Sequence, residues 1–172
     1  MKNNPPVSLS QFGAVAAAPL HLALVEPEIP PNTGNVARLC AATGCALHLV
    51  EPLGFSIGDR ELKRAGLDYW SHVALVVHPS LDAFLDATAM QRRWFFSTRG
   101  SHAYAQAPFS LGDVLVFGKE TRGLPADLLA RYPERVLRIP MRAASVRSIN
   151  LSTAVGIAAY AALAQIGFPN LT

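Results

Sequence analysis

The chain has 172 residues, 51% of them hydrophobic, a length that buries the core of one domain without the disulfides that smaller proteins need. Its net charge of +3 is far below that of a histone-like binder of nucleic acid. The only cysteines, Cys40 and Cys45, have no companion pair and no histidine at zinc-ligand spacing, which excludes a disulfide framework and a zinc site. We therefore expect a cytoplasmic protein without a metal, whose cysteines are small buried side chains.

Residues 1–19 contain three prolines and show no sustained hydrophobic period. Their apolar stretch is short and follows a polar lead that contains prolines, which is not typical of an export signal. We expect a flexible N-terminal tail over residues 1–19 and a single domain over residues 20–172.

From Leu20 onward, short apolar runs of the kind that form strands alternate with helical patterns. This alternation predicts an α/β fold built on a mostly parallel sheet. Several strands are apolar on both sides, which requires helices on both faces of the sheet. We predict strands at 20–26, 46–52, 72–78, 94–99, 113–118 and 135–140, and helices at 35–44, near 81–89, near 125–130 and at 151–166.

The C-terminal segment 148–172 contains no charged residue. A membrane span is one interpretation, but the apolar content is largely alanine, interrupted by polar residues and glycine, which favours a helix buried by protein. Apolar residues run all the way round helix 151–166, so more than one side of it must be covered. A second copy of the chain would cover the other side, which predicts a homodimer through this helix. An extra loop of the same chain is the alternative.

Charge is distributed unevenly along the chain. Residues 1–91 carry five Lys/Arg and eight Asp/Glu, whereas residues 92–147 carry ten and four. A face that binds a polyanion would produce this asymmetry, and so would a solvated surface with an accidental bias. Charge alone does not decide between these interpretations.

Three polar loops follow predicted strands, at the edge where open α/β sheets bind their ligands. In the first, residues 27–40, two prolines and the sequence Asn-Thr-Gly-Asn predict a rigid turn that caps a helix. This turn would bring Asn32, Asn35 and Arg38 together near the helix start, with Arg38 about one turn inside the helix. Taken alone, the loop favours a purely structural interpretation, as helix caps and a surface arginine.

The second loop, residues 117–125, has the sequence FGKETRGLP. Gly118 at the strand end permits a close approach of the backbone to a ligand. Between Gly118 and Gly123 lie Lys119, Glu120 and Arg122, and a purely structural turn does not need three charges at the mouth of a buried strand. The pattern is moderately specific for a binding site.

The third loop, residues 139–152, places Arg142, Arg147, Ser148 and Asn150 beside the start of the last helix. The free N–H groups of a helix start can bind a carboxylate or a polar ligand. A purely structural interpretation makes Ser148 the N-cap of this helix. Neither a GxGxxG motif after a strand nor a Walker loop occurs, and the five histidines suggest no Ser-His-Asp triad.

Together, the three loops resemble the SPOUT superfamily of RNA methyltransferases, which carry a C-terminal deep trefoil knot. The resemblance is strongest to the small tRNA (cytidine/uridine-34 2'-O)-methyltransferases of the wobble position. It rests on residues 22–55, on FGKETRGLP and on the IPM, RSINLS and AVGIAAYAAL segments, in that order. It covers about residues 20–168, nearly the whole expected domain.

The resemblance implies S-adenosylmethionine as the methyl donor and tRNA, through its anticodon stem-loop, as a partner. In relatives, the donor lies bent in the knot and is contacted largely by backbone. Carried onto this sequence, the donor pocket falls within residues 96–100 and the two later loops, and its residues would be Phe96, Thr98, Gly100, Gly118, Ile139, Met141 and Ser148.

Catalysis is carried over to Arg38, with Asn32, Glu120, Ser148 and Asn150 nearby. Related enzymes are thought to use the arginine as a general base, but a guanidinium is effectively always protonated. We expect Arg38 instead to orient the acceptor and to stabilise the developing alkoxide, while a phosphate or water takes the proton. The loop between Met141 and Arg147 is one residue longer than in close relatives, which leaves the contacts of residues 142–146 undefined.

Three alternatives remain at this point. The first is ribose 2'-O-methylation at another position of tRNA or rRNA, although the lack of an added N-terminal RNA-binding domain favours the small wobble-type enzyme. The second is a protein that binds RNA on the same fold without catalysis, which the catalytic residues disfavour. The third is a metabolic enzyme that binds a nucleotide, which would not explain the excess of Lys and Arg in residues 92–147.

Overall fold

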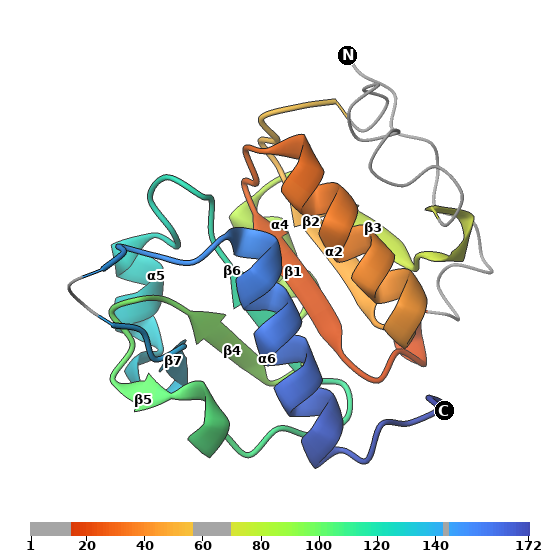
Figure 1. Ribbon diagram of the computed structural model, residues 1–172. Coiled ribbons are helices and arrows are strands. Elements are labelled where there is room, and N and C mark those ends of the chain that lie inside the picture. Colours follow the sequence, from red (N-terminus) through yellow and green to blue (C-terminus); the bar gives the residue numbers. More distant parts are fainter. Residues whose placement is uncertain (1–14, 57–69, 143–144) are drawn as a thin grey trace.

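A computed structural model describes residues 15–56, 70–142 and 145–172 of the chain. In these residues, seven parallel strands form one sheet in the order β3-β2-β1-β6-β4-β7-β5 (Figure 1). The strands are β1 (His21–Val25), β2 (Ala46–Val50), β3 (Leu75–His78), β4 (Arg93–Phe96), β5 (His102–Ala103), β6 (Val114–Phe117) and β7 (Val136–Arg138). The helices are α2 (Pro30–Thr43), α4 (Leu81–Ala87), α5 (Ala126–Arg131) and α6 (Leu151–Gln165), with 3-10 turns at Trp70–His72, Tyr104–Gln106 and Pro133–Arg135.

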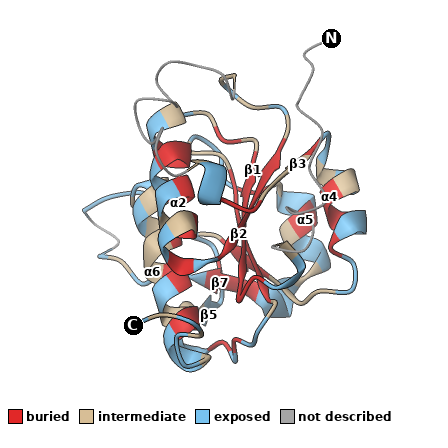
Figure 2. Cartoon of the chain, turned by 90° about the vertical axis from the view of Figure 1, so that its right-hand side faces the viewer, coloured by how far each residue is buried: buried red, intermediate tan, exposed pale blue. Residues whose placement is uncertain are grey.

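Helices cover both faces of this sheet. Helices α2 and α6 lie on one face, and α4 and α5 lie on the other (Figure 2). Strands β1, β2 and β6 are buried along their whole length, as a sheet enclosed on both sides requires. The predicted α/β class and the parallel sheet with helices on both faces are confirmed.

The strand pleat assigns alternate residues to the two halves of the core. Leu22 and Leu24 of β1 pack in the cluster that contains α2 and α6 residues, whereas Ala23 and Val25 pack with α4 and α5. Cys40 and Cys45 are buried free thiols in the first half. Burial raises the pKa of both thiols, so they act as small apolar side chains, as predicted.

Helix α2 begins five residues earlier than the sequence analysis predicted. It starts at Pro30, and two prolines occupy its first positions. The fixed φ of proline suits a helix. Its missing N–H does no harm in the first turn, because N–H groups there have no partner within the helix. The two prolines therefore start the helix rather than forming a turn before it. The predicted start at residue 35 is therefore wrong.

Helix α6 ends within one residue of its predicted limit. Its buried side faces the sheet and α2 through Val155, Ala158 and Leu163, while Tyr160 on the outer side is 49% exposed. Contacts within the chain thus cover one side of the helix, and the homodimer stays a prediction. No helix of the described residues is long and apolar enough to span a membrane.

Residues 1–14 of the predicted tail lie outside the described residues. Just before β1, Ala18 is buried and packs with Ala46 and Ala74. At the other edge of the sheet, the two-residue strand β5 pairs with β7 and was not predicted, because it is too short for a hydrophobic period.

A row of three buried histidines crosses β1, β2 and β3. His21 Nδ1 lies 2.9 Å from His48 Nε2, and His48 Nδ1 lies 2.8 Å from His78 Nε2. In each pair one ring nitrogen donates and the other accepts. Phe84 of α4 meets the rings of His48 and His78 edge-on. Burial lowers the pKa of all three histidines, and burial together with the charges of His21 and His78 brings that of His48 to about 3. The row is therefore neutral at physiological pH.

Candidate active site at the carboxyl edge of the sheet

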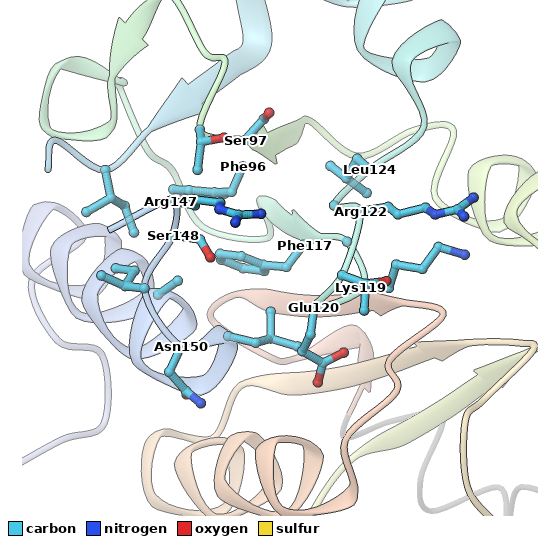
Figure 3. A pocket seen from close by; sticks show the side chains of 18 of the residues that line it. Phe96, Ser97, Phe117, Lys119, Glu120, Arg122, Leu124, Arg147, Ser148 and Asn150 are labelled. Atoms are coloured by element: carbon cyan, nitrogen blue, oxygen red, sulfur yellow. The ribbon is translucent and has the colours of Figure 1, made fainter. Parts of the chain in front are cut away.

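The loops that follow β4, β6 and β7 enclose one cavity of about 560 Å³ (Figure 3). Because the strands are parallel, their carboxyl ends meet at this edge of the sheet. The start of α6 closes the cavity from the side of the third loop. Its lining side chains include Phe96, Thr98, Arg99, Phe117, Glu120, Arg122, Leu124, Ile139, Met141, Arg147, Ser148 and Asn150.

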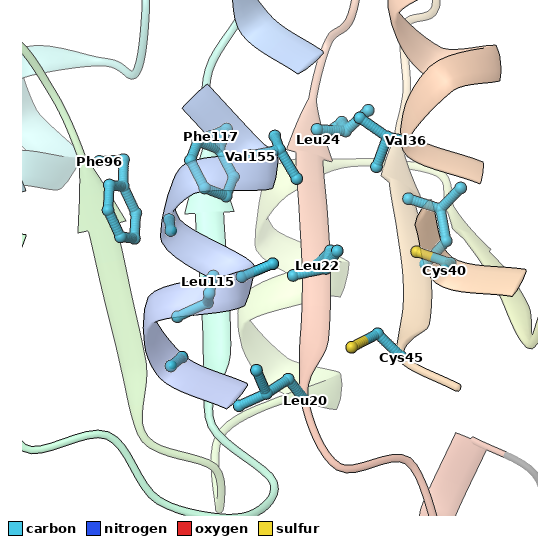
Figure 4. Packing of buried hydrophobic residues seen from close by; sticks show 14 of the residues in the cluster. Leu20, Leu22, Leu24, Val36, Cys40, Cys45, Phe96, Leu115, Phe117 and Val155 are labelled. Atoms are coloured by element: carbon cyan, nitrogen blue, oxygen red, sulfur yellow. The ribbon is translucent and has the colours of Figure 1, made fainter. Parts of the chain in front are cut away.

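Two aromatic rings at the ends of neighbouring strands line the cavity. Phe96 and Phe117 are register partners on β4 and β6, and their rings stack with centroids 4.6 Å apart. Both rings belong to the core cluster that includes Val155 of α6 (Figure 4). The cavity therefore has a rigid apolar floor, suited to a flat apolar group of a ligand.

The loop after β6 is a tight turn that needs glycine at its start. A Cβ on Gly118 would lie 2.1 Å from the backbone carbon of Gly123, so no side chain fits there. Lys119 forms an isolated bridge with Gly123, and its ammonium group pairs with the carboxylate of Glu26 after β1. This turn fixes Glu120 beside the cavity.

The Glu120 carboxylate binds the segment at the start of helix α2 from a different loop. It accepts hydrogen bonds from the backbone N–H groups of Glu28, at 2.8 Å, and Ile29, at 3.2 Å. It also accepts one from Asn32 Nδ2, at 2.9 Å. The first two residues of α2 are prolines without an N–H, so Glu120 binds the N–H groups of the two residues that precede the helix and fixes the chain where α2 begins.

The Asn32 side chain also hydrogen-bonds to Asn150, at the start of helix α6. Asn150 Nδ2 donates to Asn32 Oδ1 at 2.9 Å, and Asn150 Oδ1 accepts from the backbone N–H of Thr153 at 3.2 Å. Asn150 is therefore the N-cap of α6, and the purely structural interpretation of Ser148 as that cap is wrong: the helix begins at Leu151, two residues later than a cap at Ser148 requires. We call Glu120, Asn32 and Asn150 the polar clamp, because their hydrogen bonds join the three loops.

Most of the predicted site residues come together in this cavity. Those that line it are Asn32, Phe96, Thr98, Gly118, Glu120, Ile139, Met141, Ser148 and Asn150. Figure 3 shows the Ser148 side chain near the Phe117 ring. The Ser148 hydroxyl makes no hydrogen bond to any residue that the structure describes. It is therefore available to a ligand.

Two of the predicted residues lie elsewhere. Gly100 packs against β7, where a Cβ would lie 2.6 Å from the backbone carbon of Leu137, so it shapes the sheet edge rather than lining the cavity. Arg38 lies on the exposed side of α2 and does not line the cavity. Because α2 starts at Pro30, Arg38 lies about two turns inside the helix rather than one.

Several residues of this edge had no predicted role. Phe117 ends a predicted strand, and its place beside Phe96 follows only from the β4–β6 pairing. Glu28 accepts hydrogen bonds from Thr121 N and Thr121 Oγ1, both at 3.0 Å, which holds the second loop against the first. Thr121 lies 93 residues from Glu28, so no local signal could have identified this contact.

The fold and the cavity are those of an α/β protein with a candidate ligand site at the carboxyl edge of a parallel sheet. Residues 19–160 match the model of the SpoU rRNA Methylase family. The chain is 53% identical over 148 residues to the tRNA (cytidine(34)-2'-O)-methyltransferase of Burkholderia ambifaria, covering 84% of this chain and 94% of the relative. The chain therefore belongs to the SpoU rRNA Methylase family.

Solved structures share this fold. One, from work on the 2-OH methylation of C/U34 on tRNA, is 54% identical with a TM-score of 0.80 and covers 85% of this chain and 95% of its own. The AdoMet-bound rRNA methyltransferase of Sinorhizobium meliloti is 24% identical with a TM-score of 0.77, and the match covers 88% of this chain and 59% of that one. The fold thus occurs in a methyltransferase that binds S-adenosylmethionine.

Proposed function

We propose that this chain is an S-adenosylmethionine-dependent tRNA methyltransferase that methylates the ribose 2'-hydroxyl of the wobble nucleotide, position 34, when that nucleotide is cytidine or a modified uridine. The observation that carries the proposal is the convergence of the three polar loops on one cavity. The relatives at more than 50% identity support the substrate, because their names specify nucleotide 34 of tRNA and its 2'-hydroxyl.

The cavity suits the methyl donor in size and chemistry. Its volume of about 560 Å³ falls in the range of about 300–1,000 Å³ that is usual for small-molecule sites. Leu124, Ile139 and the Phe117 ring would hold the adenine, while backbone groups of the three loops read its polar edge. Thr98, Met141 and Ser148 complete the proposed donor site, and Gly100 supports it from behind.

S-adenosylmethionine, when bound, supplies a methyl group on a sulfonium that is already a good leaving group. The carbon–sulfur bond breaks as the ribose oxygen bonds to the methyl carbon, and the hydroxyl proton passes to water or a phosphate. The chain has to align the acceptor and assist loss of this proton. We assign alignment to the free Ser148 hydroxyl, and we assign Glu120, Asn32 and Asn150 the task of holding the loops that present it.

Arg38 keeps its proposed role on the acceptor side. From the exposed side of α2 it can meet a bound RNA, orient the ribose and stabilise the developing alkoxide. Arg38→Ala should therefore lower kcat by about 100-fold or more, a loss usual for groups that stabilise developing negative charge. S-adenosylhomocysteine should bind as before. The exposed Arg131, at the end of α5, offers a matched control, Arg131→Ala.

The trefoil knot and the assembly also belong to this proposal. Strand β6 lies between β1 and β4, and β7 lies between β4 and β5, so the later strands are inserted among earlier ones. This order supports a chain that is threaded through its own loop near the cavity. We further propose a cytoplasmic homodimer through α6 that binds the anticodon stem-loop of tRNA.

Mapping of the modified nucleotide tests the function. Purified protein, labelled S-adenosylmethionine and tRNA transcripts should yield 2'-O-methylation at nucleotide 34, and a transcript with 2'-deoxyribose at that position should accept no label. Methylation at another nucleotide would favour the related ribose methyltransferases. Binding of tRNA without any methyl transfer would favour a protein that only binds RNA.

A further inference from the structure

Three arginines from different loops line the cavity. Arg99 follows β4, Arg122 lies in the turn after β6, and Arg147 precedes α6. All three are exposed, and their guanidinium groups form no hydrogen bond or ion pair with any residue in the described part of the chain. Figure 3 shows Arg122 and Arg147 extending from two of these loops. We call these three residues the arginine rim.

The acidic groups of this edge do not neutralise the arginine rim. The Glu26 carboxylate pairs with Lys119, and that of Glu28 accepts from Thr121. The Glu120 carboxylate accepts from two backbone N–H groups and from Asn32. Each carboxylate is thus engaged within the loops, and the three guanidinium groups retain their full charge.

Three other arginines of the basic half, Arg92, Arg93 and Arg138, are held by the fold. Arg92 pairs with Asp113 at 2.8 Å, and Arg93 donates to the carbonyl oxygen of Leu85 at 2.7 Å. Arg138 donates to the carbonyl oxygens of Gly100 and Ser101. The rim therefore differs from these arginines in leaving all its donors available at the mouth of a cavity.

The methyl donor cannot balance this charge. S-adenosylmethionine has one carboxylate but also a sulfonium and an ammonium group, so it can satisfy one guanidinium and adds positive charge itself. The three exposed guanidinium groups therefore offer binding capacity for a further anion beside such a ligand. Consecutive phosphates of an RNA backbone supply several anions at once, and guanidinium groups bind phosphate oxygens through paired hydrogen bonds.

We propose that Arg99, Arg122 and Arg147 bind the phosphate backbone of the RNA next to the nucleotide that enters the cavity. The inference rests on the proposed function and adds the contacts that hold the substrate. Because phosphates carry no sequence information, the rim positions the RNA and leaves the choice of nucleotide to other contacts.

The salt dependence of tRNA binding tests this assignment. The full-length chain and the variant Arg99→Gln/Arg122→Gln/Arg147→Gln are titrated with tRNA at several salt concentrations, and folding is checked by thermal melting. The logarithm of the association constant falls as the logarithm of the salt concentration rises. Each lost phosphate contact should make this slope shallower by roughly 0.7–0.9 and should weaken binding about five- to eightfold near 0.1 M salt. The matched control is Arg131→Gln/Arg135→Gln, two exposed arginines outside the cavity.

Binding of S-adenosylhomocysteine separates the outcomes. A shallower slope in the rim variant, with the control unchanged, supports the proposal. An unchanged slope with weaker binding of S-adenosylhomocysteine overturns it, since the rim would then serve the donor alone. If the wild type methylates nucleotide 34 while the rim variant keeps the wild-type slope, the rim assignment fails and the proposed function stands. If the wild-type protein neither binds nor methylates tRNA, both the rim assignment and the proposed function are wrong.

Discussion

Asn150 donates a hydrogen bond from its amide nitrogen to the side-chain oxygen of Asn32, 2.9 Å away, although 118 positions separate them in the sequence. Asn32 in turn donates to Glu120, and Asn150 caps α6. The amide of Asn32 thus connects the starts of two helices with the turn after β6. This connection explains how three loops that are remote in sequence are held around one cavity.

Loss of the Asn32 amide should loosen this arrangement. Asn32→Ala removes both hydrogen bonds and leaves the Glu120 carboxylate without one of its three donors. Unsatisfied polar groups cost about 1–3 kcal/mol, so the free energy of unfolding should fall by that amount. Urea unfolding measures it, and Asn35→Ala on the exposed side of the same helix is the control. Equal stability of the two variants would contradict the role of the clamp.

The turn after β6 should not accept a side chain at its first residue. Gly118→Ala places a Cβ 2.1 Å from the backbone of Gly123, so the turn must open. Overpacking of this kind costs typically about 1–3 kcal/mol. The displaced turn would also move Glu120, and we expect both a lower melting temperature and loss of S-adenosylhomocysteine binding. Wild-type melting and binding in this variant would show that the turn is not needed.

The histidine row should make stability depend on pH. Burial, followed by the charges of His21 and His78, lowers the pKa of His48 in the folded protein to about 3, whereas an unfolded histidine titrates near about 6.5. The unfolded chain therefore binds more protons below pH of about 6.5. The contribution of His48 is complete above that pH and is lost as the pH falls toward about 3.

His48→Gln measures this contribution. Between pH of about 6 and 4, the free energy of unfolding of the wild type should fall more steeply than that of the variant, by up to about 1.4 kcal/mol per pH unit for one proton. His102→Gln, at an exposed position of β5, is the control. Parallel slopes for the wild type and His48→Gln would mean that His48 is not held neutral in the fold.

The outer side of α6 tests the homodimer. Tyr160 is 49% exposed, and its ring lies 6.4 Å from that of Phe168, which is 41% exposed. If a second copy covers these rings, Tyr160→Glu buries a charge in the interface and should shift sedimentation toward the monomer. Met90→Glu, at a position 99% exposed, should not. A wild-type monomer at micromolar concentration would contradict the dimer.

The sequence was sufficient for the layers of the fold, because strand and helix periods are local. In strands such as Val114–Phe117, consecutive residues are all apolar and all buried. The start of α2 was misplaced, since two prolines are compatible with both a turn and a first helical turn. The sequence alone also left a cap at Ser148 open as an alternative, because serine and asparagine both cap helices, and only the structure assigns that role to Asn150.

The candidate site was predictable as a set of loops but not as a set of contacts. Glu120 was identified by its place after a strand, yet its hydrogen bonds to Glu28, Ile29 and Asn32 at the start of α2 depend on the β1–β6 pairing. Arg38 was assigned to the site through the family resemblance, and its distance from the helix start was underestimated because the helix was expected to start later. Side chains that act through distant partners leave no local pattern.

Calorimetric titration with S-adenosylhomocysteine tests most directly whether the carboxyl-edge cavity is a donor site. We expect one binding site per chain in the wild type and no measurable heat in Gly118→Ala. Absence of binding by the folded wild-type protein, or wild-type affinity in Gly118→Ala, would contradict the donor site proposed here.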